Sequence, residues 1–466
     1  MSDTLMISVS GMRGHVGTDL TPELVARHAA ALGAWVRTSV ASQVAGTARA
    51  AVRPAVVLGR DARTSGPMFA HAAAAGLMSV GVDVIDLGVV PTPTVQMAVE
   101  HHHAGAGLIL TASHNPIEWN ALKFVGPDGI FLDAEAGARV RTLADSGPPR
   151  MGWDGIGTVR EDPEAVTRHL DAILALPMID VTAIRARAFH VALDCVRGAG
   201  ATAIPALLER LGCRMTGINL EADGRFPRPP EPVPENLGEL GELVRRSGAA
   251  VGLAVDPDVD RLALVDERGQ AIGEDYTLAF AVRAVLDRRT SAAIVPTVVV
   301  NLSTSLVVED AVRTAGARLV RAPVGEANVA RTIRDEGAVI GGEGNGGVML
   351  PALHIGRDAP LGVALILHLL ATTGVTVSEL VAASPRYTIV KAKGPRGPEL
   401  QPLYDKLRAR FRDADADERD GLRLSWRDRW LHVRPSGTEP IVRLIAEAPT
   451  TGDAESLVAA ARELLQ

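Results

Sequence analysis

Three aspartates stand at alternate positions, Asp256, Asp258 and Asp260, directly after the apolar run 251–255. In an extended backbone alternate side chains point to one side, so all three carboxylates can converge on one hard cation. Carboxylate ligands suit Mg²⁺, which takes few protein oxygens and completes its shell with phosphate or water. The segment therefore predicts a Mg²⁺ site, and the alternative is a solvated acidic turn without a metal.

A serine follows a second apolar run, 107–110, in the segment TASHNP at residues 111–116. At a junction of strand and turn, Ser113 is held in place and presented outward, as a nucleophile or a phosphate carrier must be. The surroundings do not match the G-x-S-x-G turn of hydrolases. Serine and asparagine before proline are also common turn formers, so a purely structural turn is the alternative.

Two further loops carry groups that suit an anionic sugar. RPSGTEP at 434–440 offers backbone N–H groups beside the guanidinium of Arg434, a pattern typical of an anion nest. GGEGNGG at 341–347 is expected to be a flexible loop, with Glu343 and Asn345 available to sugar hydroxyls. It matches neither the P-loop nor the dinucleotide-binding fingerprint. Either loop could instead be structural.

The elements that must position these loops form a repeating pattern of short apolar runs and Ala/Leu-rich helical segments. Strand–helix alternation predicts three similar α/β domains with mixed, largely parallel sheets covered on both faces. The predicted strands are 56–58, 84–87, 107–110, 189–193, 213–218, 250–255, 298–302, 317–321 and 338–341, and the predicted helices are 68–80, 201–211, 237–247, 306–314 and 327–336. Ligands bind beyond the carboxyl ends of such strands, so the loops after the last strand of each unit are expected to share one central cleft.

The pattern changes after residue 370, where Ala371–Val375 is a predicted hinge. Strands near 431–433 and 441–447 and a helix over 454–465 predict a smaller C-terminal α+β domain. The predicted domains are 1–152 with the serine loop, 153–272 with the aspartate triplet, 273–372 with the glycine-rich loop and 373–466 with the RPSGTEP loop.

Composition excludes several classes of partner. The 466 residues carry a net charge of −7, and nucleic-acid binders usually carry a basic excess. No apolar run approaches the ~20 residues that span a bilayer, and the N-terminal residues do not resemble a signal peptide. With Cys195 and Cys213 as the only cysteines, a reducing cytoplasm is the simpler expectation. We therefore expect a cytoplasmic protein with small-molecule ligands, no nucleic acid and no membrane.

The motifs taken together resemble the α-D-phosphohexomutase family, which includes phosphoglucomutases, phosphomannomutases and phosphoglucosamine mutases. The resemblance rests on TASHNP, D-x-D-x-D-R, G-E-x-x-G and RPSGTEP in this order; VVLGRDARTSG before TASHNP, and DCVRGAG and ADGRFP after it, fit the family pattern too. It covers essentially the whole chain. It implies four domains around a central cleft and transfer of a phosphoryl group between O1 and O6 of a hexose phosphate, through a phosphoserine and a bisphosphorylated sugar.

The resemblance also implies a role for each loop. Ser113 would carry the phosphoryl group, and its phosphate would bind one Mg²⁺ together with the three aspartates. Arg261 would contact the transferring group, and Glu343 and Asn345 the sugar hydroxyls. The phosphate that does not react would be bound by Arg434, Ser436, Gly437 and Thr438, with Arg443 close by.

Proton transfer at the sugar hydroxyl requires a titratable group, and arginine is a poor one. Lys123 is one of only four lysines among 48 basic residues, and it matches the lysine of the N-x-x-K segment of the family. We predict it as the general acid/base, with Arg13 and His114 as supporting candidates. The alternative is a surface lysine.

The substrate is less sharply specified. TASHNPIEWNALKF together with GGEGNGG most resembles phosphoglucosamine mutases, with phosphomannomutase/phosphoglucomutase activity as the alternative. Many bacterial members have serine and histidine where this chain has Asn345 and Gly347, which leaves the hydroxyl selectivity open. A sugar bisphosphate is the expected activator, and a monomer or a homodimer the expected state. Rival classes are a metal-dependent phosphatase with an aspartate nucleophile and a catalytically silent sugar-phosphate-binding protein.

Overall fold

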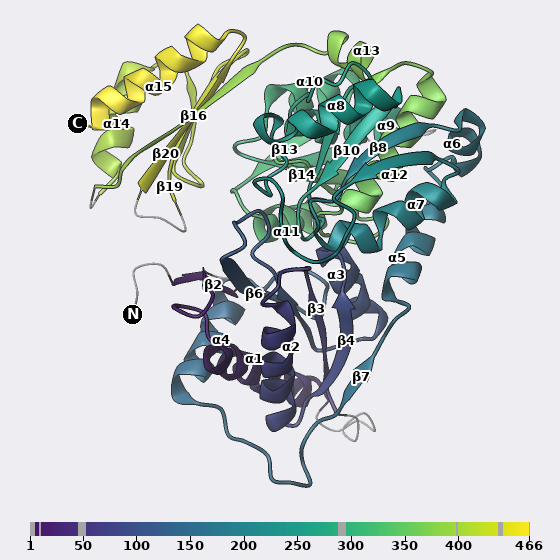
Figure 1. Cartoon of the computed structure of the whole chain (residues 1–466). Coiled ribbons are helices and arrows are strands. Elements are labelled where there is room, and N and C mark those ends of the chain that lie inside the picture. Colours follow the sequence, from purple (N-terminus) through teal and green to yellow (C-terminus); the bar gives the residue numbers. More distant parts are fainter. Residues whose placement is uncertain are drawn as a thin grey trace.

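The computed structural model describes residues 5–8, 11–44, 53–287, 295–397, 399–436 and 441–465, which form four sheets with their own helices (Figure 1). The first three sheets are mixed, with mostly parallel pairs in their centres, and the fourth is entirely antiparallel. The prediction of three α/β domains followed by a smaller α+β domain is therefore confirmed.

The first sheet has the order β1-β2-β6-β5-β3-β4-β7, and its parallel part joins β5, β3, β4 and β7. Helices α1, α2 and α4 pack on one face, and α3 packs on the other. The strands are β1 (Met6–Ser8), β2 (Gly11–His15), β3 (Ala55–Arg60), β4 (Asp83–Val89), β5 (Ala106–Leu110), β6 (Trp119–Val125) and β7 (Val159–Glu161), and the helices are α1 (Pro22–Val44), α2 (Gly66–Ser79), α3 (Thr92–His101) and α4 (Ala134–Ser146). Strand β7 lies beyond residue 152 and still belongs to this sheet.

The second and third sheets, of orders β11-β10-β8-β9 and β13-β12-β14-β15, share one hydrophobic core. Helices α9 and α12 both contribute to that core, and α12 is buried from Ala359 to Leu370, which explains its apolar sequence. The strands are β8 (His190–Asp194), β9 (Arg214–Ile218), β10 (Val251–Val255), β11 (Leu262–Val265), β12 (Thr297–Asn301), β13 (Arg318–Ala322), β14 (Ile340–Glu343) and β15 (Gly347–Met349). The helices are α5 (Ala165–Leu174), α6 (Val181–Arg187), α7 (Ile204–Arg210), α8 (Gly238–Ser247), α9 (Glu274–Asp287), α10 (Leu306–Thr314), α11 (Glu326–Glu336) and α12 (Ala359–Thr373), with 3₁₀ turns at Ala199–Thr202 and Pro234–Asn236.

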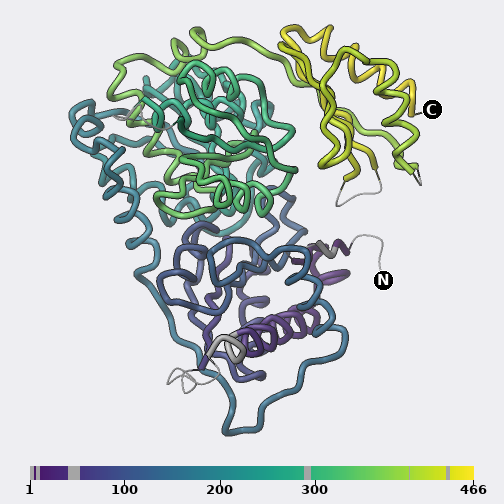
Figure 2. Tube along the Cα trace, turned by 180° about the vertical axis from the view of Figure 1, so that it is seen from behind, coloured from purple at the N-terminus to yellow at the C-terminus, as the bar shows by residue number. Residues whose placement is uncertain are grey.

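The fourth sheet has the order β16-β20-β19-β18-β17, with α14 and α15 on its apolar face. Its elements, and the helix α13 that precedes them, are α13 (Val377–Ala382), β16 (Thr388–Pro395), α14 (Gln401–Arg410), β17 (Asp415–Asp417), β18 (Leu422–Ser425), β19 (Trp430–Pro435), β20 (Ile441–Ala448) and α15 (Thr451–Leu465). This fourth domain and strand β2 lie on the same side of the molecule in both views (Figures 1 and 2). None of the described helices is long and apolar enough to cross a membrane.

The predicted hinge Ala371–Val375 is wrong in its first half. Helix α12 continues through Thr373: Ala371 still packs against the shared core, and the hydroxyls of Thr372 and Thr373 donate to carbonyl groups one turn earlier. It ends at Gly374, which adopts the left-handed conformation (φ 73°) that glycine tolerates best.

Candidate active site

Ser113 lies three residues beyond the end of β5 and is 3% exposed. Its φ of +49° is unusual for a residue other than glycine, and such strain often occurs at functional sites. The hydroxyl of Ser113 donates to Oδ2 of Asp256 at 2.9 Å. The serine loop and the aspartate loop, far apart in the sequence, therefore meet.

A buried arginine holds the serine loop in this shape. Arg63 is fully buried, and its side chain donates to the carbonyl groups of four residues of the 113–119 segment. The distances are 2.6 Å to Pro116 and 2.9 Å to Trp119 from Nη1, and 2.7 Å to Ser113 and 2.6 Å to Asn115 from Nη2. Nε donates to Asp61 at 3.0 Å, so all five N–H donors of the guanidinium are used. Arg63 of the GRDARTSG segment therefore supports the serine loop from within the protein.

The three aspartates converge, although not in the way the sequence predicts. The segment after β10 is a turn, with Val259 at φ +64°, instead of an extended strand. Oδ1 of Asp256 accepts the backbone N–H groups of Asp260 and Arg261 at 3.1 and 3.2 Å and so closes the turn. The carboxylate oxygens of Asp256, Asp258 and Asp260 lie within 4.8 Å of one another, and all three residues are buried.

The electrostatics of this cluster fit a divalent cation. Burial and the neighbouring carboxylates of Asp260 and Asp258 raise the pKa of Asp256 well above its usual range. Burial would also raise the pKa of Asp258, but the ammonium of Lys123 holds it below its usual value. Oδ1 of Asp258 and Oδ1 of Asp260 are buried and have no hydrogen-bond partner among the described residues. Unpartnered buried carboxylate oxygens are the donors that Mg²⁺ requires.

Lys123 comes from β6, the antiparallel neighbour of β5. Its Nζ donates to Oδ2 of Asp258 at 2.7 Å and lies 4.0 Å from Oδ2 of Asp260. The side chain is 14% exposed, and Nζ lies 5.7 Å from the centre of the Phe131 ring. The structure thus brings this lysine to the aspartate cluster.

A cavity of about 550 Å³ opens above the cluster and is lined by residues of the first three domains. The predicted residues Arg13, Ser113, His114, Lys123 and Arg261 all line it. The positive charge of Arg261, together with burial, lowers the pKa of His114 well below its usual range, so this ring is neutral near pH 7.

Another buried arginine, which sequence reasoning missed, connects the aspartate loop to the glycine-rich segment. Arg357 donates to Oδ2 of Asp260 at 2.5 Å, to Oε2 of Glu343 at 3.0 Å and to Oε2 of Glu326 at 3.1 Å. Glu343 is 4% exposed and does not line the described cavity, because its carboxylate also accepts from Asn301 and from a backbone N–H group. The only sequence signal for this region is a charged pair, Arg-Asp, immediately before the apolar segment of α12.

The glycine-rich segment is not the expected flexible loop. Residues 340–349 form the antiparallel hairpin β14–β15, in which Glu343 pairs with Gly347. Asn345 occupies the turn, and its Oδ1 accepts the N–H of Gly347 at 3.2 Å. Hydrogen bonding across the hairpin satisfies backbone groups that a flexible loop would leave to water.

Three of the predicted phosphate-binding residues of the fourth domain, Arg434, Ser436 and Arg443, do not line the described cavity. Arg434 forms an ion pair with Asp420 at 3.0 Å, and Ser436 is buried at the end of β19. Arg443 is opposite Arg434 on the neighbouring strand β20. Gly437 and Thr438 fall outside the described residues.

Polar contacts dock the fourth domain on the third. The buried ring of His432 contacts Oγ of Ser303 at 2.8 Å, and Asp420 accepts the backbone N–H of Val324 at 3.0 Å. Glu447 bonds the hydroxyl of Ser305 and accepts the N–H of Leu306 at 2.8 Å, at the N-terminus of α10. Burial lowers the pKa of His432 to about 4.

Three α/β domains that bring together a serine, a carboxylate triplet and a lysine, followed by a fourth α+β domain, agree with the phosphohexomutase class that the motifs predict. Comparison with known families confirms this class. Domains described as phosphoglucomutase/phosphomannomutase α/β/α domains I, II and III and C-terminal domain match residues 5–150, 167–269, 273–387 and 391–464. The chain belongs to the phosphoglucomutase/phosphomannomutase family.

Individual relatives match over nearly their whole length. A probable phosphoglucosamine mutase of Methanopyrus kandleri is 38% identical, with 96% of this chain and 95% of the relative covered. A phosphoglucomutase/phosphomannomutase of Thermococcus kodakarensis is 36% identical, with 98% and 97% covered. The crystal structure of a phosphoglucomutase/phosphomannomutase family protein from Burkholderia thailandensis superposes with a TM-score of 0.84 at 26% identity, covering 99% and 98% of the two chains.

Proposed function

We propose that the protein moves a phosphoryl group between O1 and O6 of a hexose phosphate, through phosphorylated Ser113 and a bisphosphorylated sugar. The observation that carries the proposal is the contact between Ser113 and the carboxylate triplet. The hydroxyl of Ser113 lies 2.9 Å from Oδ2 of Asp256, a member of the triplet, and Ser113 lines the cavity. A cavity of about 550 Å³ falls within the range that small-molecule ligands occupy in proteins. The reaction class is an intramolecular phosphoryl transfer, an isomerisation.

Asp256, Asp258 and Asp260 would hold one Mg²⁺ per chain together with the phosphate on Ser113. When bound, Mg²⁺ neutralises negative charge on the transferring oxygens, which is much of what catalysis of phosphoryl transfer requires. Arg261 and Arg13 add guanidinium groups at the wall of the same cavity.

We assign Lys123 as the general acid/base that exchanges a proton with the attacking sugar hydroxyl. Its Nζ lies at the aspartates and lines the cavity, and an ammonium group can lose a proton, whereas a guanidinium cannot. Neutral His114 is a second candidate to accept a proton, because its ring nitrogen Nδ1 lies 3.4 Å from the hydroxyl of Ser113.

Further residues are assigned to the sugar and its second phosphate, and those of them that the structure describes do not line the cavity. Glu343 and Asn345 would bind sugar hydroxyls, and Arg434, Ser436, Gly437, Thr438 and Arg443 would bind the phosphate that does not react. The proposal therefore requires the fourth domain to approach the cavity when substrate binds. Breaking its contacts through His432, Asp420 and Glu447 would be part of that step.

Glucosamine 6-phosphate, converted to glucosamine 1-phosphate, is the proposed substrate, with mannose and glucose phosphates as the second candidate. The sequence of the serine loop and the glycine-rich hairpin supports the first choice, as does the similarity to a probable phosphoglucosamine mutase. The similarity to a phosphoglucomutase/phosphomannomutase supports the second. Activation by a sugar bisphosphate, a monomeric or homodimeric state and a cytoplasmic location belong to the same proposal.

The deciding experiment is a turnover panel with glucosamine, glucose and mannose 6-phosphates, with Mg²⁺ and a sugar bisphosphate. We expect the isomeric 1-phosphate, without release of inorganic phosphate, and the largest kcat/KM for glucosamine 6-phosphate. Ser113→Ala should abolish isomerisation, whereas Ser146→Ala, a matched change at the exposed end of α4, should leave it unchanged. Release of inorganic phosphate by the wild type, or isomerisation by Ser113→Ala at the wild-type rate, would refute the phosphoserine mechanism.

A further inference from the structure

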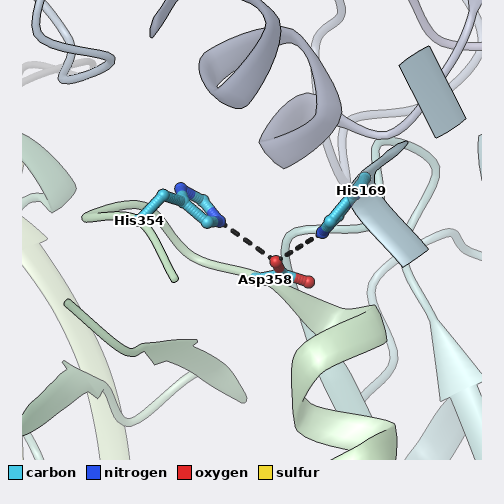
Figure 3. Close-up of side chains that lie close together, drawn as sticks. All are labelled: His169, His354 and Asp358. Carbon is cyan, nitrogen blue, oxygen red and sulfur yellow. Dashed lines mark hydrogen bonds and ion pairs between the residues drawn. The ribbon is translucent and has the colours of Figure 1, made fainter. Parts of the chain in front are cut away.

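A second buried polar cluster lies outside the cavity, where α5, the segment before α12 and α3 meet. It consists of His169, His354 and Asp358, and their side chains are at most 2% exposed. Nε2 of His169 and Nε2 of His354 lie 2.8 and 3.0 Å from the same carboxylate oxygen, Oδ2 of Asp358 (Figure 3). The proposed reaction uses none of these three residues.

The three side chains form a hydrogen-bond network in which Nδ1 of His354 has no partner among the described residues. Both rings point Nε2 at Oδ2 of Asp358, so one N–H group from each ring accounts for the two contacts (Figure 3). The other oxygen, Oδ1, accepts the backbone N–H of Leu361 at 2.8 Å and caps α12. Burial alone would raise the pKa of Asp358, but His169 and His354 hold it below its usual value, so the carboxylate is charged near pH 7.

One connection runs from this cluster to the aspartate triplet through α3. Nδ1 of His169 contacts the hydroxyl of Thr94 at 2.9 Å. Two residues earlier, at the start of the same helix, the hydroxyl of Thr92 donates to Oδ2 of Asp258 at 3.0 Å. The backbone N–H of Thr92 also donates to the carbonyl of Asp258, at 2.9 Å. The position of α3 therefore affects the position of the Asp258 carboxylate.

The other connection runs through the residue before Asp358. Arg357 donates to Oδ2 of Asp260 at 2.5 Å and to Oε2 of Glu326 at 3.1 Å. Because Asp358 is fixed by two histidines and by the N-terminus of α12, the backbone that carries Arg357 is fixed as well. His169 thus belongs to two series of contacts that lead to the triplet. One runs through α3 to Asp258, and the other runs through Asp358 and Arg357 to Asp260.

We propose that His169 is a positioning residue that sets the geometry of the metal-binding aspartates from both sides, through Thr94 and through Asp358. The inference rests on the proposed function, because it takes the triplet as the Mg²⁺ site. His169 touches neither the cavity nor the aspartates, so its substitution leaves the charges there unchanged. Losing a group that hydrogen-bonds a metal ligand typically lowers metal affinity ~10- to 100-fold. Thr92 and Arg357 are such groups here, and His169 acts from further away, so its loss should have an effect at or below the low end of that range.

The test measures the affinity of the full chain for Mn²⁺ by electron paramagnetic resonance, in the absence of substrate. Mn²⁺ serves as a spectroscopic substitute for Mg²⁺. We expect His169→Leu to weaken binding several-fold, up to about tenfold. His169→Gln places an amide where Nε2 contacts Asp358, and His169→Asn places one where Nδ1 contacts Thr94, so each should restore part of the affinity.

The matched control is His368→Leu, which removes another buried histidine from α12. His368 accepts the N–H of Asp180 at 3.2 Å and lies ten residues, about 15 Å of helix, beyond Asp358. This variant should bind Mn²⁺ as the wild type does, even if both leucine variants are less stable to urea.

Unchanged Mn²⁺ affinity in folded His169→Leu, or an equal loss in His368→Leu, would overturn the positioning role. So would a second Mn²⁺ or Zn²⁺ site that disappears in His169→Leu, because the cluster would then be a metal site itself. Failure of the wild type to bind Mn²⁺ would instead reject the metal site of the proposed function. That site is checked separately by Asp258→Asn, which should abolish the first equivalent of binding.

Discussion

Removing the guanidinium of Arg63 should damage both stability and turnover. In Arg63→Ala, Asp61 loses its buried cation, and four carbonyl groups of the serine loop lose their donor. Breaking a buried ion pair by removing one partner costs about 3–5 kcal/mol. Each carbonyl that water does not reach adds about 1–3 kcal/mol. We therefore expect the free energy of unfolding of the first domain to fall by at least about 3 kcal/mol.

Turnover should fall for a different reason. Ser113 is strained at φ +49°, and such strain persists only while the surrounding structure holds it. Without Arg63 the loop can relax, and a displacement of ~1 Å at a reacting atom costs about 100-fold in rate. Arg63→Lys separates the two effects: an ammonium can pair with Asp61, but it cannot reach all four carbonyl groups. It should lose less stability than Arg63→Ala and nearly as much turnover.

The assay pairs urea denaturation with the steady-state rate of isomerisation, and the stoichiometry of serine phosphorylation is read by intact mass after incubation with a sugar bisphosphate. Arg139→Ala is the control, because Arg139 forms only an exposed ion pair with Glu135 on α4 and should change stability by no more than about 0.5 kcal/mol. Wild-type turnover in Arg63→Ala, with a stability loss below about 1 kcal/mol, would show that the loop holds its shape without this arginine.

Three further predictions concern other parts of the molecule. Lys123→Arg should keep sugar-phosphate binding and lower kcat about 100-fold, and a near-normal kcat in steady-state assays would reject the lysine as acid/base. Arg357→Met should lower the free energy of unfolding by about 3–5 kcal/mol, because three buried carboxylates lose their cation. Adding Glu326→Gln should recover part of this loss in urea denaturation; no recovery would exclude charge repulsion as the cause. The pKa of His432 is about 4 in the folded protein and about 6.5 when unfolded, so the unfolded chain binds a proton first as pH falls. The contribution of His432 to the free energy of unfolding should be complete above pH 6.5 and should fall by about 3 kcal/mol as the pH drops toward 4. In a plot of urea midpoint against pH, His432→Gln should show a smaller decrease over this range.

The local sequence was enough to predict the elements that carry the site. Alternation of apolar runs with helical segments predicted the strands that end at Leu110 and Val255, because period and length alone distinguish these elements. The residue types after those strands predicted a serine and a carboxylate cluster. The chain order of the motifs identified the family.

Contacts between distant segments could not be predicted in the same way. The donors of Arg63 reach residues 50 to 56 positions away, and His169 contacts Asp358 across 189 positions. Nothing in the local sequence distinguishes a buried arginine that holds carbonyl groups from a surface arginine, because its burial depends on the packing of other segments.

The sequence by itself determined the fold class, the serine and the aspartate triplet, since each depends on residue type and spacing within a few positions. The tertiary structure decided how the triplet closes, where Glu343 points and which residues support the site. The turn at Val259 and the hairpin at Asn345 form because backbone groups there find partners within the folded chain. Arg357 connects the aspartate loop to the glycine-rich hairpin because the buried carboxylates of Asp260, Glu343 and Glu326 require a cation. That requirement exists only after the chain has folded.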